Sequence, residues 1–79
     1  MNYLKLKQLM AKLNISKSKI YLNIAKGLFP QPVKIGRSSF WPENEIDRLM
    51  HFLVIADREE IEIKEFVEEI MEERRNEVL

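Results

Sequence analysis

A compact series of helix and turn signals in residues 14–42 constrains the fold more than any other feature of the sequence. Ser16 is a favourable helix N-cap, because its hydroxyl can accept a free backbone N–H of the first helical turn. Gly27 supplies the left-handed conformation with which helices commonly end. These two signals predict a helix over about residues 17–26, and the apolar spacing before them predicts a shorter one over about residues 6–13.

A β-hairpin is predicted immediately after this second helix. Pro30 and Pro32 force an extended path, since each proline restricts its own backbone and that of the preceding residue. Apolar and aromatic residues then flank a glycine-containing turn, which predicts a two-stranded hairpin over about residues 33–41. So short a hairpin is unstable alone and must lie on the helices. We expect Val33, Ile35 and an aromatic residue of the return strand to make that contact.

Two further helices are predicted in the C-terminal half. The first, over about residues 43–55, begins with acids that suit a positive helix N-terminus. Its apolar stripe consists of Ile46, Leu49, Met50, Leu53 and Val54. The second, over about residues 59–76 with Asp57 as its cap, is apolar on one face and acidic on the other. The expected fold is therefore mainly α: a small winged helix-turn-helix domain with a two-stranded β wing at residues 1–55, and an acidic C-terminal helical extension at residues 56–79.

The charges of the two halves are segregated. Residues 1–42 contain seven lysines and one arginine with no acid, a formal charge of +8. Residues 43–79 contain five basic residues and thirteen acids, a formal charge of −8, so the whole chain carries no net charge. Such an asymmetry suggests a polyanionic partner for the first half. The alternative is that both halves are ordinary solvated faces, but these rarely separate so completely.

The sequence offers little for catalysis, metal binding or membrane insertion. It has no cysteine, one histidine (His51) and two isolated glycines that form no phosphate-binding loop. The acids lie on helical surfaces without the spacing of a calcium loop, and no apolar run approaches about 18 residues. We therefore expect no enzymatic activity, no cofactor, no metal site, no membrane contact and a cytoplasmic, nucleoid-associated location.

The predicted helix at residues 17–26 has the properties of a DNA-recognition helix. Two short helices joined by a tight turn, the second without acids, match a helix-turn-helix, and the hairpin matches its wing. The lysines expected to neutralise phosphates and to make binding salt-dependent are Lys17, Lys19 and Lys26. The outward face also includes Ser18 and Leu22, a leucine that burial does not require. Arg37 at the hairpin tip is placed to enter a minor groove, and Lys34 lies on one strand beside it.

Four motifs occur in order along about residues 3–50: LKLKQLM at the start, SKSKIY in the second helix, GLFPQPVKIG in the loop and strand, and FWPENEID where the third helix begins. In this order they resemble the AlpA family of phage and prophage regulators, which are similar to small MerR-like winged-helix excisionases. The resemblance implies DNA contacts from Lys17, Ser18, Lys19 and Tyr21 in the second helix, and from Arg37 and Ser38 in the wing. The chain departs from the family at Leu22, where arginine is frequent, and in the length of its acidic extension.

We therefore expect a sequence-specific protein of a phage or mobile element that binds double-stranded DNA. The resemblance implies that it regulates integrase transcription or acts as an excisionase. The apolar face of the acidic helix needs a cover. We expect a second copy of the chain, forming a homo-oligomer, or an integrase or other recombinase to provide it, with folding back onto the first and third helices as the alternative. A different function stays open: a protein-interaction module whose acidic helix binds a basic partner.

Overall fold

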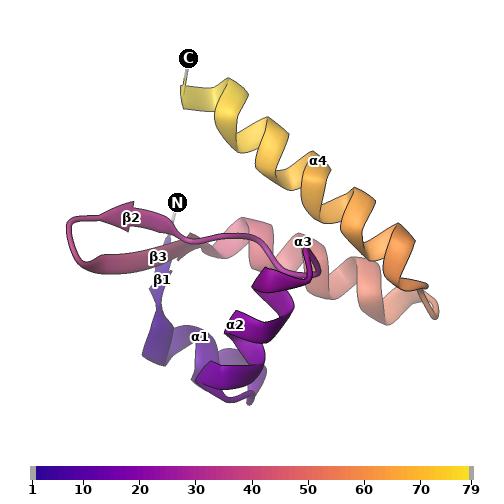
Figure 1. The fold of residues 1–79 in the computed structure, drawn as a ribbon, viewed down its shortest axis with the longest axis horizontal. Coiled ribbons are helices and arrows are strands. Elements are labelled where there is room, and N and C mark those ends of the chain that lie inside the picture. The colour runs from indigo at the N-terminus through magenta and orange to yellow at the C-terminus, as the bar shows by residue number, and fades with distance from the viewer. Residues whose placement is uncertain (1, 79) are drawn as a thin grey trace.

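The computed structural model describes residues 2–78, which form four helices and a three-stranded antiparallel sheet (Figure 1). In chain order the elements are β1 (Tyr3–Lys5), α1 (Leu6–Leu13), α2 (Lys17–Ala25), β2 (Val33–Ile35), β3 (Ser38–Pro42), α3 (Glu43–Ile55) and α4 (Glu60–Val78). The mainly α class and the winged helix-turn-helix arrangement are confirmed. α1 and α3 have the predicted bounds, while α2 ends and α4 begins one residue away from the prediction.

The helix ends follow from local sequence. The hydroxyl of Ser16 accepts a hydrogen bond of 3.2 Å from the backbone N–H of Lys19, as expected of an N-cap. Asn14 and Gly27 have φ angles of 53° and 76°, so each places a left-handed residue after a helix. The cap predicted for α4 is wrong: Glu59, not Asp57, stands at the N-cap, because its carbonyl accepts the N–H of Ile63 at 3.1 Å.

The sheet has the order β1-β3-β2. The predicted hairpin is present, with Val33 opposite Phe40. Strand β1 is an addition that the sequence pattern does not predict, since three residues are too few to show a period. It pairs with the C-terminal part of β3, where Leu4 lies opposite Trp41. β1 therefore holds the base of the hairpin and leaves the tip to project, as Figure 1 shows.

Ile35 does not make the predicted contact with the helices. Its side chain is 66% exposed. It lies opposite Ser38, beyond the part of β3 that pairs with β1. The prediction is wrong because alternation identifies the face of a strand but not how far the supporting elements reach along it. Val54 is a second case: it belongs to the predicted apolar stripe of α3 but is 82% exposed near the end of that helix.

All four helices and the sheet contribute to one core. Its buried apolar members are Leu4, Leu9, Ile20, Phe29, Trp41, Ile46, Leu49, Val67 and Ile70. Trp41 is fully buried, and its indole joins the base of the hairpin to the loop after α2. Burying each large side chain contributes roughly 1.5–3 kcal/mol. The core thus fixes the position of the hairpin relative to α2.

α4 folds back onto the same chain. Val67 and Ile70 are buried in the core, and the rings of Phe66 and Phe52 stack with centroids 4.2 Å apart. An ion pair of 2.6 Å between Arg48 and Glu73 joins α3 to α4 further along. The cover for the apolar face of α4 is therefore intramolecular, in place of the second chain or recombinase expected from the sequence. The reason is that the first three helices leave enough apolar surface on α3 to receive it.

Candidate nucleic-acid interface

α2 presents one face to solvent. Ile20 is fully buried and Ile24 is half-buried, so these two residues define the side of α2 that meets the core. The residues exposed on the rest of its surface are Lys17, Ser18, Lys19, Tyr21, Leu22 and Ala25, and Lys26 at its C-cap is exposed as well. Every site residue predicted on this helix is therefore accessible. The exposed face contains three lysines and no acid, as the sequence predicts.

Asn23 differs from its neighbours because its side chain is engaged within the helix. Its amide Nδ2 donates a hydrogen bond of 2.9 Å to the backbone carbonyl of Lys19. An amide held in this way has fewer groups left for a base edge. Among the polar side chains of α2, those of Ser18 and the lysines are better placed for an external partner.

The hairpin tip is open. Gly36 has a φ angle of 62°, which favours glycine, and a Cβ added there would have no neighbour within 4 Å. Arg37 and Ser38 follow it and are exposed. The ammonium of Lys34 donates a hydrogen bond of 2.7 Å to the hydroxyl of Ser39 on the opposite strand. The three residues predicted on the wing therefore lie together on the hairpin.

The two faces of the sheet meet different helices. Lys34 lies opposite Ser39, and alternation places both on the sheet face of buried Trp41. On the other face, Tyr3 and Val33 line a cleft of about 350 Å³ with residues from the C-terminal part of α4. Figure 1 shows α1 and α2 on one side of the sheet and α4 on the other. The wing lysine thus lies on the side of the sheet that α2 occupies.

Ion pairs use few of the basic residues in the first half. Among the residues described, Lys12 is the one member of that half in an ion pair, at 2.8 Å from Glu43 and 3.0 Å from Asp47. The hydrogen bonds that the Lys12 ammonium donates to these carboxylates raise its pKa above the ordinary value, and the bond from Lys12 lowers the pKa of Glu43. The α2 lysines and Arg37 make no such pair and are available to an external anion.

The arginines of the second half are largely committed to internal contacts. Arg74 donates two hydrogen bonds to the carboxylate of Glu45, one of them of 3.0 Å from Nε. It also donates one of 2.7 Å from Nη1 to the carbonyl of Gln31. Arg74 therefore joins α4 both to α3 and to the loop before the wing. Arg74 and Glu45 were not predicted as part of the site, because partners 29 positions apart leave no local signal in the sequence.

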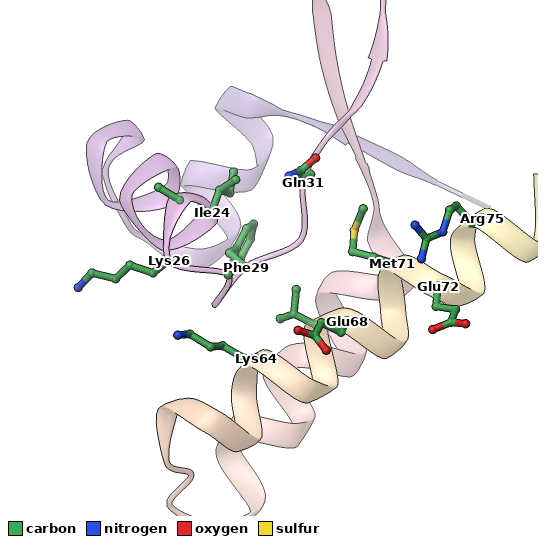
Figure 2. Close-up of a pocket in the computed structure, with 12 residues that line it drawn as sticks. Ile24, Lys26, Phe29, Gln31, Lys64, Glu68, Met71, Glu72 and Arg75 are labelled. Atoms are coloured by element: carbon green, nitrogen blue, oxygen red, sulfur yellow. The ribbon is translucent and has the colours of Figure 1, made fainter.

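A groove of about 670 Å³ lies between the C-terminal end of α2 and α4. In Figure 2, Lys26 extends from the end of α2 and Lys64 from α4, with Glu68 and Glu72 further along α4. Phe29 provides part of its apolar surface. Both acidic and basic residues of α4 line the groove, so it lacks the uniform charge of the exposed α2 face.

Within residues 2–78, no three His, Cys, Asp or Glu side chains gather as metal ligands. None of the helices in that range is both long and apolar enough to cross a bilayer.

Comparison with known proteins identifies the family. The family model described as "Prophage CP4-57 regulatory protein (AlpA)" matches residues 2–54. The match includes β1, α1, α2 and the hairpin, and it ends before α4. No curated protein and no solved structure matches the chain. Because the matched span exceeds half of the sequence and contains the four motifs identified above, the chain belongs to the AlpA family of prophage regulatory proteins.

Proposed function

We propose that this protein binds double-stranded DNA through α2 and the β2–β3 hairpin, as a transcriptional regulator of a phage or mobile element. The observation that carries the proposal is the acid-free, exposed face of α2 together with Arg37 at the projecting hairpin tip. Both come from the part of the chain that matches a regulatory family. A target of this kind would place the protein at the nucleoid.

The proposed contacts divide between two grooves. α2 lies in the major groove, where Ser18 and Tyr21 reach base edges or the sugar-phosphate backbone. Lys17, Lys19 and Lys26 neutralise phosphates on the two sides of that groove. The hairpin tip approaches the adjacent minor groove with Arg37, supported by Ser38 and Lys34.

We further propose that the DNA site lies near an integrase gene or an attachment site. Occupying it would change integrase transcription or direct the recombinase towards excision. Both outcomes use the same DNA contacts, so the regulatory description of the family supports each equally. Recording integrase transcript and excised circular DNA in cells with and without the protein would separate the two roles.

We propose that residues 1–55 carry DNA binding and that residues 56–79 support them. The alternative function, a module whose acidic helix binds a basic partner, has less support because α4 uses Val67 and Ile70 for the chain's own core. An integrase or a second copy of the chain would have the outer, charged face of α4 available instead. In Figure 1, α4 lies on the opposite side of the sheet from α1 and α2.

Selection from a random duplex library tests the proposal. We expect enrichment of a common sequence, and a binding constant that falls linearly with salt on logarithmic axes. Lys19→Gln should reduce the salt slope by about one unit, as loss of one phosphate contact predicts. Arg75→Gln is the matched control, since it removes a positive charge from an exposed position of α4. Failure to retain any duplex at low salt would refute the proposed function.

A further inference from the structure

Leu22 lies at the outermost point of α2. It is two residues from Ile20 and two from Ile24, so at 3.6 residues per turn it points about 200° away from each. Those two isoleucines mark the direction of the core. Leu22 accordingly projects away from it, and 54% of its side chain is exposed. Burial within this chain gives no reason for a leucine there.

The neighbours of Leu22 form a surface of mixed character. Ser18 and Ala25 lie about one turn away on either side and are exposed. Because their side chains are small, the side chain of Leu22 projects beyond them. Lys19 and Lys26 flank them and are exposed as well. No acid occurs anywhere in residues 1–42. The surface therefore combines a central aliphatic group with lateral positive charge.

This combination of an aliphatic group and positive charge favours DNA as the binding partner of the α2 face. The lysines require a polyanion, and a leucine offers that polyanion no hydrogen bond. In the major groove of DNA, thymine is the base that presents an aliphatic group, its 5-methyl, beside the edges that hydrogen-bond. A protein partner would leave the surrounding lysines to be matched by acids, whereas a duplex supplies phosphates at both edges of the groove.

We propose that Leu22 is a specificity-determining residue that contacts the 5-methyl group of a thymine, with Ala25 providing a second apolar contact. The proposal rests on the proposed function, because it assigns a base preference to the same face of α2. It requires a T·A pair in the part of the site that faces the middle of the helix. Lys19 and Lys26 would hold the helix on the phosphates at either side.

Replacing thymine by deoxyuridine tests this directly, because it removes the methyl group and leaves base pairing intact. Each thymine of the selected site is replaced in turn, and the dissociation constant is measured by fluorescence anisotropy for wild type and Leu22→Ala. We expect one position at which the replacement weakens wild type by about fourfold, the effect of burying one methyl group. At that position Leu22→Ala should bind both duplexes equally.

Ile61→Ala is the matched control, since Ile61 is an aliphatic residue of α4 with similar exposure, 58%. It should keep the full response of wild type to the replaced thymine. The inference is overturned if wild type is indifferent at every thymine, or if Leu22→Ala retains the wild-type response. If binding is still salt-dependent and sequence-selective, either result would refute the role of Leu22 without contradicting the proposed function. Absence of duplex binding by wild type would instead refute both.

Discussion

The indole Nε1 of Trp41 donates a buried hydrogen bond of 2.8 Å to the backbone carbonyl of Pro30. Trp41 belongs to the return strand of the wing, and Pro30 to the loop that leaves α2. The ring of Phe29 meets the indole edge to face, with centroids 6.4 Å apart. These contacts fix the wing relative to α2. The spacing of the two proposed DNA-contacting elements is thus set inside the core.

Replacing this indole with a phenyl ring tests its role. Trp41→Phe removes the donor and leaves the Pro30 carbonyl buried without its partner, which should cost about 1–3 kcal/mol of unfolding free energy. The smaller ring adds a cavity cost in the same direction. Tyr3→Phe, a change on an exposed aromatic residue of β1, should stay within about 0.5 kcal/mol. Equal urea midpoints for Trp41→Phe and wild type would contradict the assignment.

Arg74 offers a second test of how α4 is attached. Arg74→Ala leaves the carboxylate of Glu45, which is only 7% exposed, without its cation. Breaking a buried pair on one side costs about 3–5 kcal/mol, and the residual exposure of Arg74 should keep the loss near 3 kcal/mol. Arg75→Ala removes the adjacent, exposed arginine and should change stability little. Chemical denaturation measures the unfolding free energy of both variants. Similar losses in the two would contradict a specific stabilising role for the Arg74–Glu45 pair.

Truncation after Asp57 should prevent stable folding. It removes Val67 and Ile70 from the core, together with Phe66, which stacks on Phe52. Burial of each of these side chains contributes roughly 1.5–3 kcal/mol, against a total stability of only about 5–15 kcal/mol for a domain. Loss of the cooperative thermal transition is the expected readout. A truncated chain that melts cooperatively near the wild-type temperature would show instead that α4 is dispensable for the core.

Stability should fall at acid pH in part through Glu43. Its pKa lies below the ordinary value of 4.5 because Lys12 and Asn2 donate hydrogen bonds to its carboxylate. A lowered pKa means that the stabilisation is complete above about 4.5 and is lost as pH falls through the folded-state value. The raised pKa of Lys12 acts in the opposite direction, so its contribution is present below 10.5 and is lost at higher pH.

A comparison of wild type with Glu43→Gln tests whether Glu43 contributes to the loss of stability at acid pH. The variant should be less stable near neutral pH, and the difference should shrink as wild-type Glu43 becomes protonated. Denaturation curves recorded from neutral to strongly acidic pH give this difference directly. A constant gap across the whole range would mean that protonation of Glu43 has no part in the acid transition. Glu65→Gln, on the exposed surface of α4, provides the control for loss of an acid.

An element of this fold is predictable from the sequence where the interactions that form it are local. Ser16 and Gly27 predict the limits of α2 because a cap acts within one turn of its helix. The exposed face of that helix followed from the spacing of Ile20 and Ile24. By contrast, β1 pairs with a strand far along the chain, and Arg74 bonds Glu45 29 residues away. Such contacts depend on the packed arrangement, which periodicity does not specify.

The position of α4 illustrates the same limit. The pattern predicts its apolar face and the need for a cover. It favours a partner as that cover, with folding back as the alternative, whereas the chain's own core provides it. The choice depends on whether the first three helices leave matching apolar surface, here provided by Phe52 on α3. The DNA contacts assigned to α2 and the wing stay predictions, since exposure makes contact feasible without specifying the partner.

The hairpin tip provides the last prediction. Arg37 is exposed after Gly36 on a tip that projects beyond the support of β1, and a narrow A·T-rich minor groove attracts a guanidinium there. Arg37→Ala should therefore weaken binding, reduce the salt slope by about one unit, and remove any preference for A·T-rich flanks. Arg37→Lys should restore the slope more fully than the flank preference, because lysine keeps the charge but loses the planar guanidinium. Titrations over a salt series, on duplexes that differ only in their flanks, measure both effects. Identical slopes for wild type and Arg37→Ala would show that the wing does not contact the DNA through this residue.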